Sequence, residues 1–341
     1  MRRRQLLGAI ALAPAAVFAQ ALPPPLHGRQ GLIRIAGTRS LAPVVAAWAQ
    51  AFTAANPAIR IEIALAGSDL AMAGLYTAQC DIALIGRGAT KPEVQAFEWI
   101  YRFQPRSISV LTGSVATPGC SPAIAAMVHR SNPLASLRLD QLRAAFGDNA
   151  PRARVWGDLG LGGAWRDHPI NLYAPDAESG TGRYFRESVL GGSNRLAWAR
   201  MREFSVPPRP EGAEVEAGAA LRRALARDPL GLAIGLAGSG RGYRVLPLIG
   251  GDGVAHLPDA ASIASGEYPL SRSVQAYFAH SPTATAHAEI RAFLGFTLSE
   301  HAQALAASVS DYLALTATAA SSARTALETS IPRFSRVPSW R

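Results

Sequence analysis

The chain has 341 residues, a formal net charge of +10 and only two cysteines. This length exceeds what one hydrophobic core usually serves, so two domains are expected. The positive charge does not indicate a nucleic-acid-binding protein, because the arginines are scattered, Lys91 is the only lysine, and basic clusters with interleaved aromatic residues are missing. The histidines are dispersed as well, so the sequence predicts no metal site.

The N-terminus has the pattern of an export signal. Three arginines at residues 2–4 precede an apolar run over residues 6–18 and small residues at 19–21. This succession predicts a signal peptide over residues 1–21, and the apolar run is too short to span a membrane securely. The pair Arg3-Arg4 also resembles a twin-arginine signal, with the general export pathway as the alternative. In an oxidising compartment Cys80 and Cys120 can pair or remain two free thiols.

Apolar periodicity then predicts an alternation of strands and helices. Strands are expected over residues 32–36, 61–66, 81–85, 107–111, 124–128, 170–173, 230–234, 243–249 and 273–278. Helices are expected over residues 41–52, 70–76, 137–146, 184–190, 215–226, 284–296 and 299–309, the first with Ser40 as its N-cap. The alternation favours an α/β fold with twisted, mainly parallel sheets.

The pattern breaks near Arg130, and a last strand near Arg272 is in a position to return to the first sheet. Two crossings at these points divide the chain into a discontinuous first domain, residues 30–129 plus 273–330, and a second domain, residues 130–272. Donor-rich turns from both domains would then face one cleft.

Three of these turns lie between a strand and a helix, and Ser179-Gly180-Thr181 is the clearest of them. The first-turn amides of a helix lack intrahelical partners and lie at the positive end of its dipole, so they attract anions. The hydroxyls of Ser179 and Thr181 add donors, Gly180 permits close approach, and Arg183 lies one turn into the helix. The alternative is that Ser179 or Thr181 merely caps the helix.

The other two turns carry Ser40 with the Leu41 amide and Ser68. Arg87 follows a strand directly, and ligands of open α/β sheets bind at such carboxyl ends. No nucleophile–base pair can be assigned, because His129 and His168 have no partner placed by the sequence. A binding protein is therefore expected rather than an enzyme, with a phosphatase-like enzyme using the same cleft as the alternative.

Several stretches between Leu32 and Leu315 also carry a family resemblance, in the order GTRSLAPVVAAWAQAF, LAGSDLAMAGLYTAQCDIALIGR, VHRSNPLASLRLDQLRAAF, VWGDLG, PINLYAPDAESGTGRYFRESVL and EIRAFLGFTLSEHAQALAASVSDYLAL. As a set they resemble the phosphate-binding-protein (PstS-like) family of periplasmic solute-binding proteins. The resemblance implies a two-domain type II periplasmic-binding-protein fold that closes over an oxyanion. It implies no cofactor, a periplasmic location, a monomer, phosphate or a sulfate-like anion as ligand, and an ABC-transporter permease as partner.

Matched position by position, the resemblance implies an anion site made of Ser40, Leu41, Ser68, Ser179, Gly180 and Thr181. Arg87 and Arg183 join these candidates because of their places after a strand and in the first turn of a helix. Two positions depart from the phosphate-binding pattern. Pro175 stands where those members have an arginine, and Gly86 stands where they have an aspartate. Arg39, Arg87 or Arg183 are candidates to replace the charge, and Glu178 is the candidate acceptor. A relative that acts as a sensor or interaction module is a further alternative.

Overall fold

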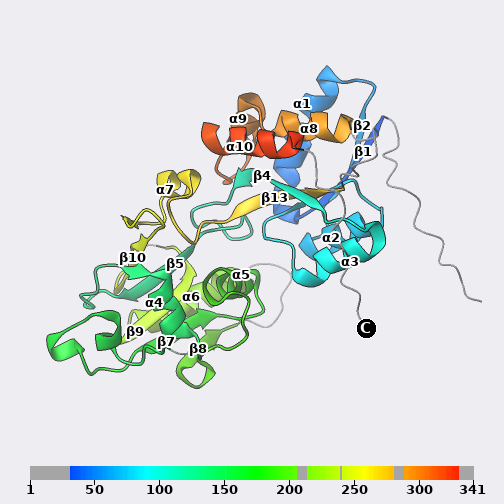
Figure 1. Cartoon of the computed structure of the whole chain (residues 1–341). Coiled ribbons are helices and arrows are strands. Elements are labelled where there is room, and N and C mark those ends of the chain that lie inside the picture. The colour runs from blue at the N-terminus through cyan, green and yellow to red at the C-terminus, as the bar shows by residue number, and fades with distance from the viewer. Residues whose placement is uncertain (1–30, 150, 206–212, 239, 280–287, 330–341) are drawn as a thin grey trace, which may run out of the picture.

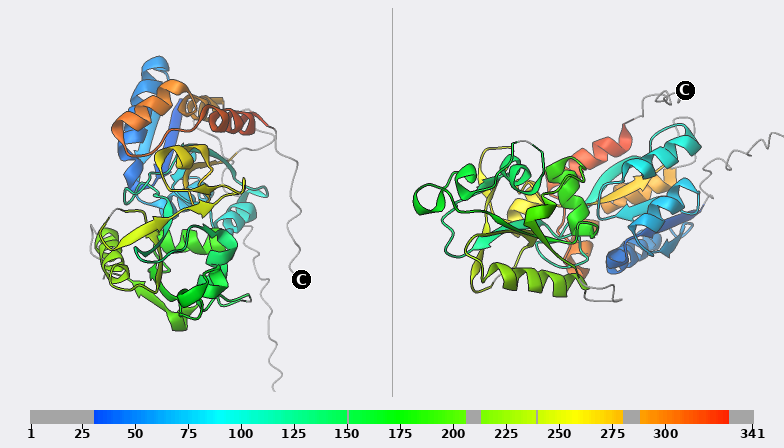
Figure 2. Two further views of the ribbon diagram at one scale, coloured as in Figure 1. Left: turned by 90° about the vertical axis from the view of Figure 1, so that its left-hand side faces the viewer. Right: turned by 90° about the horizontal axis from the view of Figure 1, so that it is seen from below.

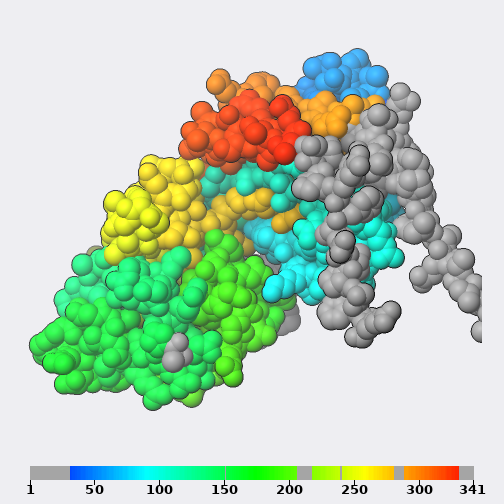
Figure 3. All heavy atoms as spheres, in the orientation of Figure 1, coloured from blue at the N-terminus to red at the C-terminus, as the bar shows by residue number. Residues whose placement is uncertain are grey.

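The computed structural model describes residues 31–149, 151–205, 213–238, 240–279 and 288–329. Within these ranges the chain forms two lobes, each built on a five-stranded sheet (Figure 1). In the space-filling view of Figure 3, green atoms of the second lobe form one end of the molecule. Blue, orange and red atoms of the first lobe form the other end. The expected two-domain α/β architecture is confirmed, but both sheets are mixed rather than mainly parallel, because four of their eight strand pairs are antiparallel.

The first sheet has the strand order β2-β1-β3-β13-β4. Its strands are β1 Leu32–Gly37, β2 Arg60–Ala64, β3 Ile82–Ile85, β4 Arg106–Thr112 and β13 Ser273–Phe278. Strand β1 pairs in parallel with β2 and β3, whereas β13 lies antiparallel between β3 and β4. A segment from the last quarter of the chain thus lies inside the N-terminal sheet.

Helices cover both faces of the first sheet, as Figures 1 and 2 show. They are α1 Ala42–Ala55, α2 Ser68–Tyr76, α3 Lys91–Tyr101, α8 Ala288–Thr297, α9 Glu300–Val309 and α10 Ala317–Glu328. Trp48 of α1 is fully buried and its indole Nε1 donates to the Ala302 carbonyl of α9 at 2.7 Å. The Phe52 ring meets Phe293 of α8 edge to face at 5.3 Å. Helices from the two ends of the chain therefore share one core.

The second sheet has the strand order β10-β5-β9-β7-β8. Its strands are β5 Ile124–His129, β7 Asn171–Pro175, β8 Met201–Phe204, β9 Gly231–Leu236 and β10 Tyr243–Leu246. The helices of this lobe are α4 Leu139–Phe146, α5 Gly180–Leu190, α6 Ala213–Leu225 and α7 Ala260–Ser265. A small third sheet joins β6 Leu137–Arg138, β11 Leu248–Ile249 and β12 Ala255–His256.

The first crossing lies earlier than the sequence predicted. Strand β5 pairs antiparallel with β9 and β10, so residues 124–129 belong to the second sheet and the crossing near Arg130 is wrong. The break at 130–133 follows β5 instead of preceding the second lobe. We call residues 113–123, which join β4 to β5, the crossing loop. The chain returns when β13 enters the first sheet directly after Arg272.

Strand direction follows from these crossings. Strands β1, β3, β7 and β9 have their carboxyl ends on the side where the lobes face each other. Strands β5 and β13 begin there, because the chain reaches each of them from the other lobe, and both are antiparallel to their neighbours. The carboxyl ends of parallel strands from both sheets thus point toward one region, where α/β proteins bind ligands.

Three local predictions need correction. Ser40 is not the N-cap of α1, because it lies in a 3-10 turn, Arg39–Leu41, and α1 begins only at Ala42. The helix expected from residue 137 begins at Leu139, because β6 pairs with β11 first. The chain was expected to close with two helices, but α10 follows them. Its buried face consists mainly of alanines, Ala320 and Ala323, with Leu327.

Candidate functional site

A polar cavity of about 420 Å³ lies between the two lobes. We call it the cleft cavity. The first lobe contributes Thr38 after β1 and Gly86 after β3, and the second lobe contributes residues at the start of α5. The crossing loop contributes Ser121, and Arg272 precedes β13. Every one of these positions lies at the end of a strand that faces the other lobe, so the fold itself brings them together.

Three helices begin at this cavity. Ser68 is the first residue of α2, Gly180 is the first residue of α5, and Thr90 is the N-cap of α3; all three line the cavity. Each dipole presents its positive end there, and the first amides of α2 and α5 have no backbone acceptor within their helices. Helix α3 adds few free donors, because Pro92 has no amide proton and the Glu93 amide donates to Thr90 Oγ1. The cleft cavity therefore offers converging donors to an anion.

Hydroxyl groups add to these amides. The Thr38 Oγ1 and Ser68 Oγ atoms lie 2.9 Å apart and share a hydrogen bond. The Thr90 side chain forms a capping box with Glu93: the Glu93 amide donates to Thr90 Oγ1, and the Thr90 amide donates to Glu93 Oε2 at 2.7 Å. The first pair links two turns of the first lobe, so Ser68 is held at the cavity by a neighbour rather than by its own helix.

Charges around the cavity are balanced. Three arginines line it, Arg87, Arg183 and Arg272, together with three carboxylates, Asp69, Glu178 and Glu187. An anion bound here would thus meet oriented hydrogen-bond donors rather than an excess of positive charge.

Arg87 is held by two of the neighbouring carboxylates. Its guanidinium donates to Glu93 Oε1 and to Asp69 Oδ1, both at 2.6 Å. Burial alone would lower the pKa of Arg87, but these hydrogen bonds and charges raise it above the usual value. Arg87 therefore remains a cation whose charge is largely compensated by its own partners.

Arg272 bridges the two lobes across the cavity. Its Nη2 donates to the Gly86 carbonyl of the first lobe at 3.1 Å, and its guanidinium lies 5.1 Å from the ring centre of Tyr184 on α5. The Tyr184 hydroxyl in turn donates to the Ser271 carbonyl. A stacked, hydrogen-bonded arginine at the return crossing thus connects both walls of the cleft.

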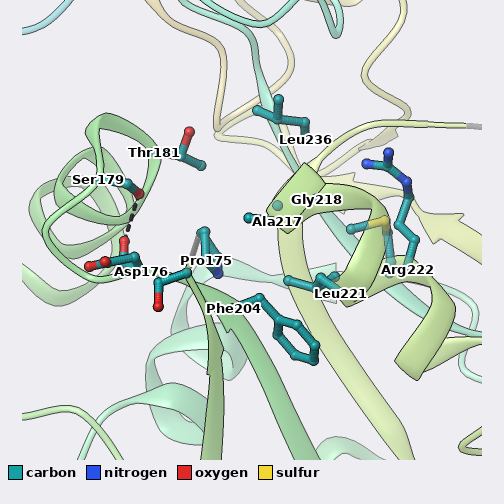
Figure 4. A pocket seen from close by; sticks show the side chains of 13 residues that line it. Pro175, Asp176, Ser179, Thr181, Phe204, Ala217, Gly218, Leu221, Arg222 and Leu236 are labelled. Carbon is teal, nitrogen blue, oxygen red and sulfur yellow. Dashed lines mark hydrogen bonds between the residues drawn. The ribbon is translucent and has the colours of Figure 1, made fainter. Parts of the chain in front are cut away.

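The sequence-predicted residues separate into three groups. Ser68, Arg87, Gly180 and Arg183 line the cleft cavity. Ser179 and Thr181 line a different pocket of about 200 Å³, whose walls include Pro175, Phe204, Leu221 and Leu236 (Figure 4). Ser40 and Leu41 line neither of these two cavities.

Ser179 acts as a helix cap in this structure. Its Oγ donates to the Asp176 carbonyl at 2.6 Å (Figure 4). The same Oγ accepts a hydrogen bond from the Gly182 amide at 3.0 Å. The one hydroxyl proton of Ser179 is therefore already engaged in the hydrogen bond to Asp176. Of the Ser-Gly-Thr turn, Gly180 is the residue that lines the cleft cavity, and nothing lies within 4 Å of the place that a Cβ on it would take.

The Ser40 turn is closed off by other parts of the chain. The hydroxyls of Ser40 and Tyr312 lie 2.8 Å apart, and the Leu41 amide donates to the Thr38 carbonyl at 3.1 Å. Gly119 of the crossing loop lies over this turn, since a Cβ added to it would be 3.9 Å from the Ser40 Cβ. Burial raises the pKa of Tyr312, which hydrogen bonds to Ser40 and Ser121 partly oppose.

The proposed substitutes for the missing arginine and aspartate differ in position. Arg39 is exposed and does not line the cleft cavity, and Pro175 lines the apolar pocket. Glu178 does line the cleft cavity, but it already pairs with Arg186 at 3.0 Å and Arg183 at 3.4 Å.

Sequence reasoning missed several residues of the cleft cavity: Thr38, Thr90, Ser121, Tyr184 and Arg272. The pattern Thr90-x-x-Glu93 is a capping-box signature that marks the start of α3, a helix the sequence reading left out. Ser121 carries no comparable signal, because its place depends on the crossing loop.

The described ranges hold neither a metal-ligand cluster nor a candidate membrane-spanning helix nor a cysteine pair. No cluster of three or more His, Cys, Asp or Glu residues able to hold a metal ion occurs there. None of the helices in those ranges is both long and apolar enough to cross a membrane. Cys80 is buried and Cys120 half-buried, and both are free thiols. Burial raises the pKa of Cys80 to about 12.

Known proteins resemble this chain over most of its length. A family model described as "PBP superfamily domain" matches residues 24–301. The phosphate-binding protein PstS of Pseudomonas aeruginosa is 28% identical over 324 residues, covering 89% of this chain and 92% of PstS. Two solved structures show the fold alone. An ABC-type phosphate transport receptor from Vibrio cholerae has a TM-score of 0.53 at 18% sequence identity, and the match covers 82% of this chain and 99% of the receptor. PstS from Borrelia burgdorferi has a TM-score of 0.57 at 13% sequence identity, and the match covers 84% of this chain and 99% of that PstS.

Proposed function

The chain belongs to the PBP superfamily, and from this premise we propose that it binds a small oxyanion, phosphate first, and passes it to an ABC importer. The family match confirms the resemblance expected from the sequence motifs. The two domains in this proposal are residues 31–112 with 273–329 and residues 124–270, joined by the crossing loop and by the return at Arg272.

The observation that carries the proposal is the meeting of three helix starts at the cleft cavity. The first residues of α2 and α5 come from different lobes, and the N-cap of α3 joins them. Donors from both lobes can saturate one oxyanion only when the lobes approach each other. Binding therefore drives closure about the two crossings.

Phosphate is the first choice because the Pseudomonas aeruginosa relative is named as a phosphate-binding protein. Ser68, Arg87, Gly180 and Arg183 are the ligand residues in this proposal, since they line the cleft cavity. Ser40, Leu41, Ser179 and Thr181 would reach the ligand only after rearrangement, because their donors serve other groups or face elsewhere.

The proposed location is the periplasm, where the ligand is handed to the permease of the importer. The signal expected over residues 1–21 lies outside the described residues, so this part rests on the sequence pattern. A binding role is preferred to an enzymatic one because the matched relatives are named as binding and transport proteins.

Calorimetric titration of the purified protein with phosphate, sulfate and chloride tests the proposal. We expect saturable binding of phosphate and no heat from chloride, together with a smaller radius of gyration in X-ray scattering when phosphate is bound. Hydrolysis of p-nitrophenyl phosphate is measured beside it, and turnover there would favour the enzyme instead. Absence of binding to either oxyanion would refute the proposed function.

A further inference from the structure

Gly86 and Ser121 meet in the wall of the cleft cavity. Gly86 follows β3, Ser121 belongs to the crossing loop, and both line the cavity. A Cβ added to Gly86 would lie 1.9 Å from the Ser121 Oγ and 3.2 Å from its Cβ. The Ser121 hydroxyl therefore occupies the space that a side chain at residue 86 would need, and a carboxylate has no room there.

Ser121 adopts a backbone conformation that serine rarely takes. Its φ is 47°, in the left-handed region, although it is not glycine. Such a conformation is unfavourable for a residue with a side chain and persists only where surrounding contacts impose it. The residue is also buried, with 4% of its surface exposed.

The crossing loop imposes this position through its own closure. The Ser114 amide donates to the Cys120 carbonyl at 2.9 Å, and the Ala123 amide donates to the Ser114 carbonyl at 3.0 Å. A Cβ added to Gly113 would lie 2.0 Å from the Ser121 carbonyl oxygen. Glycine at residue 113 thus lets the loop fold tightly enough to bring Ser121 against Gly86.

We propose that Ser121 is a specificity-determining residue whose hydroxyl, which also meets Tyr312, contacts the bound oxyanion in the cleft cavity; unlike Ser40, Ser121 lines that cavity. This inference rests on the proposed function and specifies which oxyanions the cleft accepts. An ionised carboxylate only accepts hydrogen bonds, so a carboxylate beside an anion selects one that carries a proton. A hydroxyl donates as well as accepts, so it also suits an oxyanion without any proton. The cleft accordingly accepts sulfate-like dianions as well as phosphate.

Ser121→Ala and Ser121→Gly test this role by calorimetric titration with sulfate and phosphate at about pH 8. The parent is expected to bind both anions. Loss of one hydrogen bond to a charged ligand should weaken binding of each about tenfold to a hundredfold in both variants. Glycine tolerates positive φ, so an equal loss in Ser121→Gly separates the hydroxyl from backbone strain. Ser114→Ala is the matched control, because Ser114 lies in the same loop and does not line the cavity; its affinities should stay at the parent's.

The double variant Gly86→Asp with Ser121→Gly places a carboxylate in the vacated space. It should lose sulfate binding and retain phosphate binding at about pH 5.5, where phosphate holds its additional proton. The role of Ser121 is overturned if both single variants bind as the parent does, or if the parent binds phosphate and rejects sulfate. A parent that binds neither anion would overturn the proposed function along with it, so the two failures are distinct.

Discussion

Two turns of the first lobe carry similar donors but have different surroundings. The hydroxyl of Ser40 lies against Tyr312, and the crossing loop covers its turn, whereas Ser68 lines the cleft cavity and shares a hydrogen bond with Thr38. Both turns follow a strand and precede a helix. A donor-rich helix start is thus a ligand site only where the rest of the chain leaves it uncovered.

The same contrast occurs within α5 alone. Gly180, Arg183, Tyr184 and Glu187 line the cleft cavity, and their spacing of three, four and seven residues places them on one helix face. Ser179 and Thr181 line the apolar pocket instead. The start of α5 therefore presents one polar face to the cleft cavity, whereas the side chains of Ser179 and Thr181 lie at the other pocket.

The largest effect should come from Ser68→Ala. If Ser68 donates to the bound anion, its loss removes a hydrogen bond to a charged group, worth about 1.5–3 kcal/mol, or about a tenfold to hundredfold weaker affinity. Calorimetric titration with phosphate measures this change.

Ser40→Ala is the matched control for that change. It should leave phosphate affinity unchanged and lower the free energy of unfolding by about 1 kcal/mol, because its hydroxyl serves Tyr312. Equal losses of affinity in the two variants would contradict the contrast between the turns.

Ser179→Ala should have an intermediate effect, on stability rather than on affinity. Removing an N-cap serine costs about 1 kcal/mol, and here the Gly182 amide loses its acceptor. Thermal unfolding of the ligand-free protein measures the loss, with titration beside it. Thr181→Val, which keeps the branched shape, should leave affinity unchanged too. A large affinity loss in Ser179→Ala with unchanged stability would assign this hydroxyl to the ligand.

The smallest effect concerns Glu93, which holds Arg87 beside the Ser68 turn. Burial raises the pKa of Glu93, but hydrogen bonds from Arg87 and Thr90 outweigh it and hold the pKa below its usual range. A lowered folded-state pKa stabilises the fold above the unfolded value of about 4.3, and this contribution is lost as the pH falls through the folded value. Glu93→Gln should therefore be less stable than the parent at about pH 7, and the gap should shrink below about pH 4.

Urea unfolding at about pH 7 and about pH 3.5 measures this gap. Glu62→Gln is the control, because Glu62 is half exposed and its pair with Arg60 lies on the surface, where such pairs contribute little. If the difference in free energy of unfolding between Glu93→Gln and the parent stays constant with pH, the carboxylate charge is not what holds Arg87.

Local patterns in the sequence predicted much of the fold. Strand β13 has the bounds expected from its alternation, and Ser179 is the N-cap that its turn indicated. Apolar spacing likewise predicted the buried face of α1. In each case the information lies within one element, where periodicity and capping operate.

The composition of the cleft was less predictable, because it depends on pairs that are distant in sequence. Tyr312 reaches Ser40 across most of the chain, and Ser121 fills the space beside Gly86 only through the shape of the crossing loop. The misplaced first crossing has the same origin. The residues of β5 form an ordinary buried strand, and nothing local tells which sheet they join.

The insertion of β13 between β3 and β4 also sets the order of assembly during synthesis. All five strands of the second sheet have left the ribosome once residue 246 has emerged, whereas the first sheet lacks the strand between β3 and β4 until residue 278 follows. Until then β3 and β4 have open edges that other chains can pair with. The half of the protein that is made first is therefore completed last, and its strand edges stay unpaired the longest.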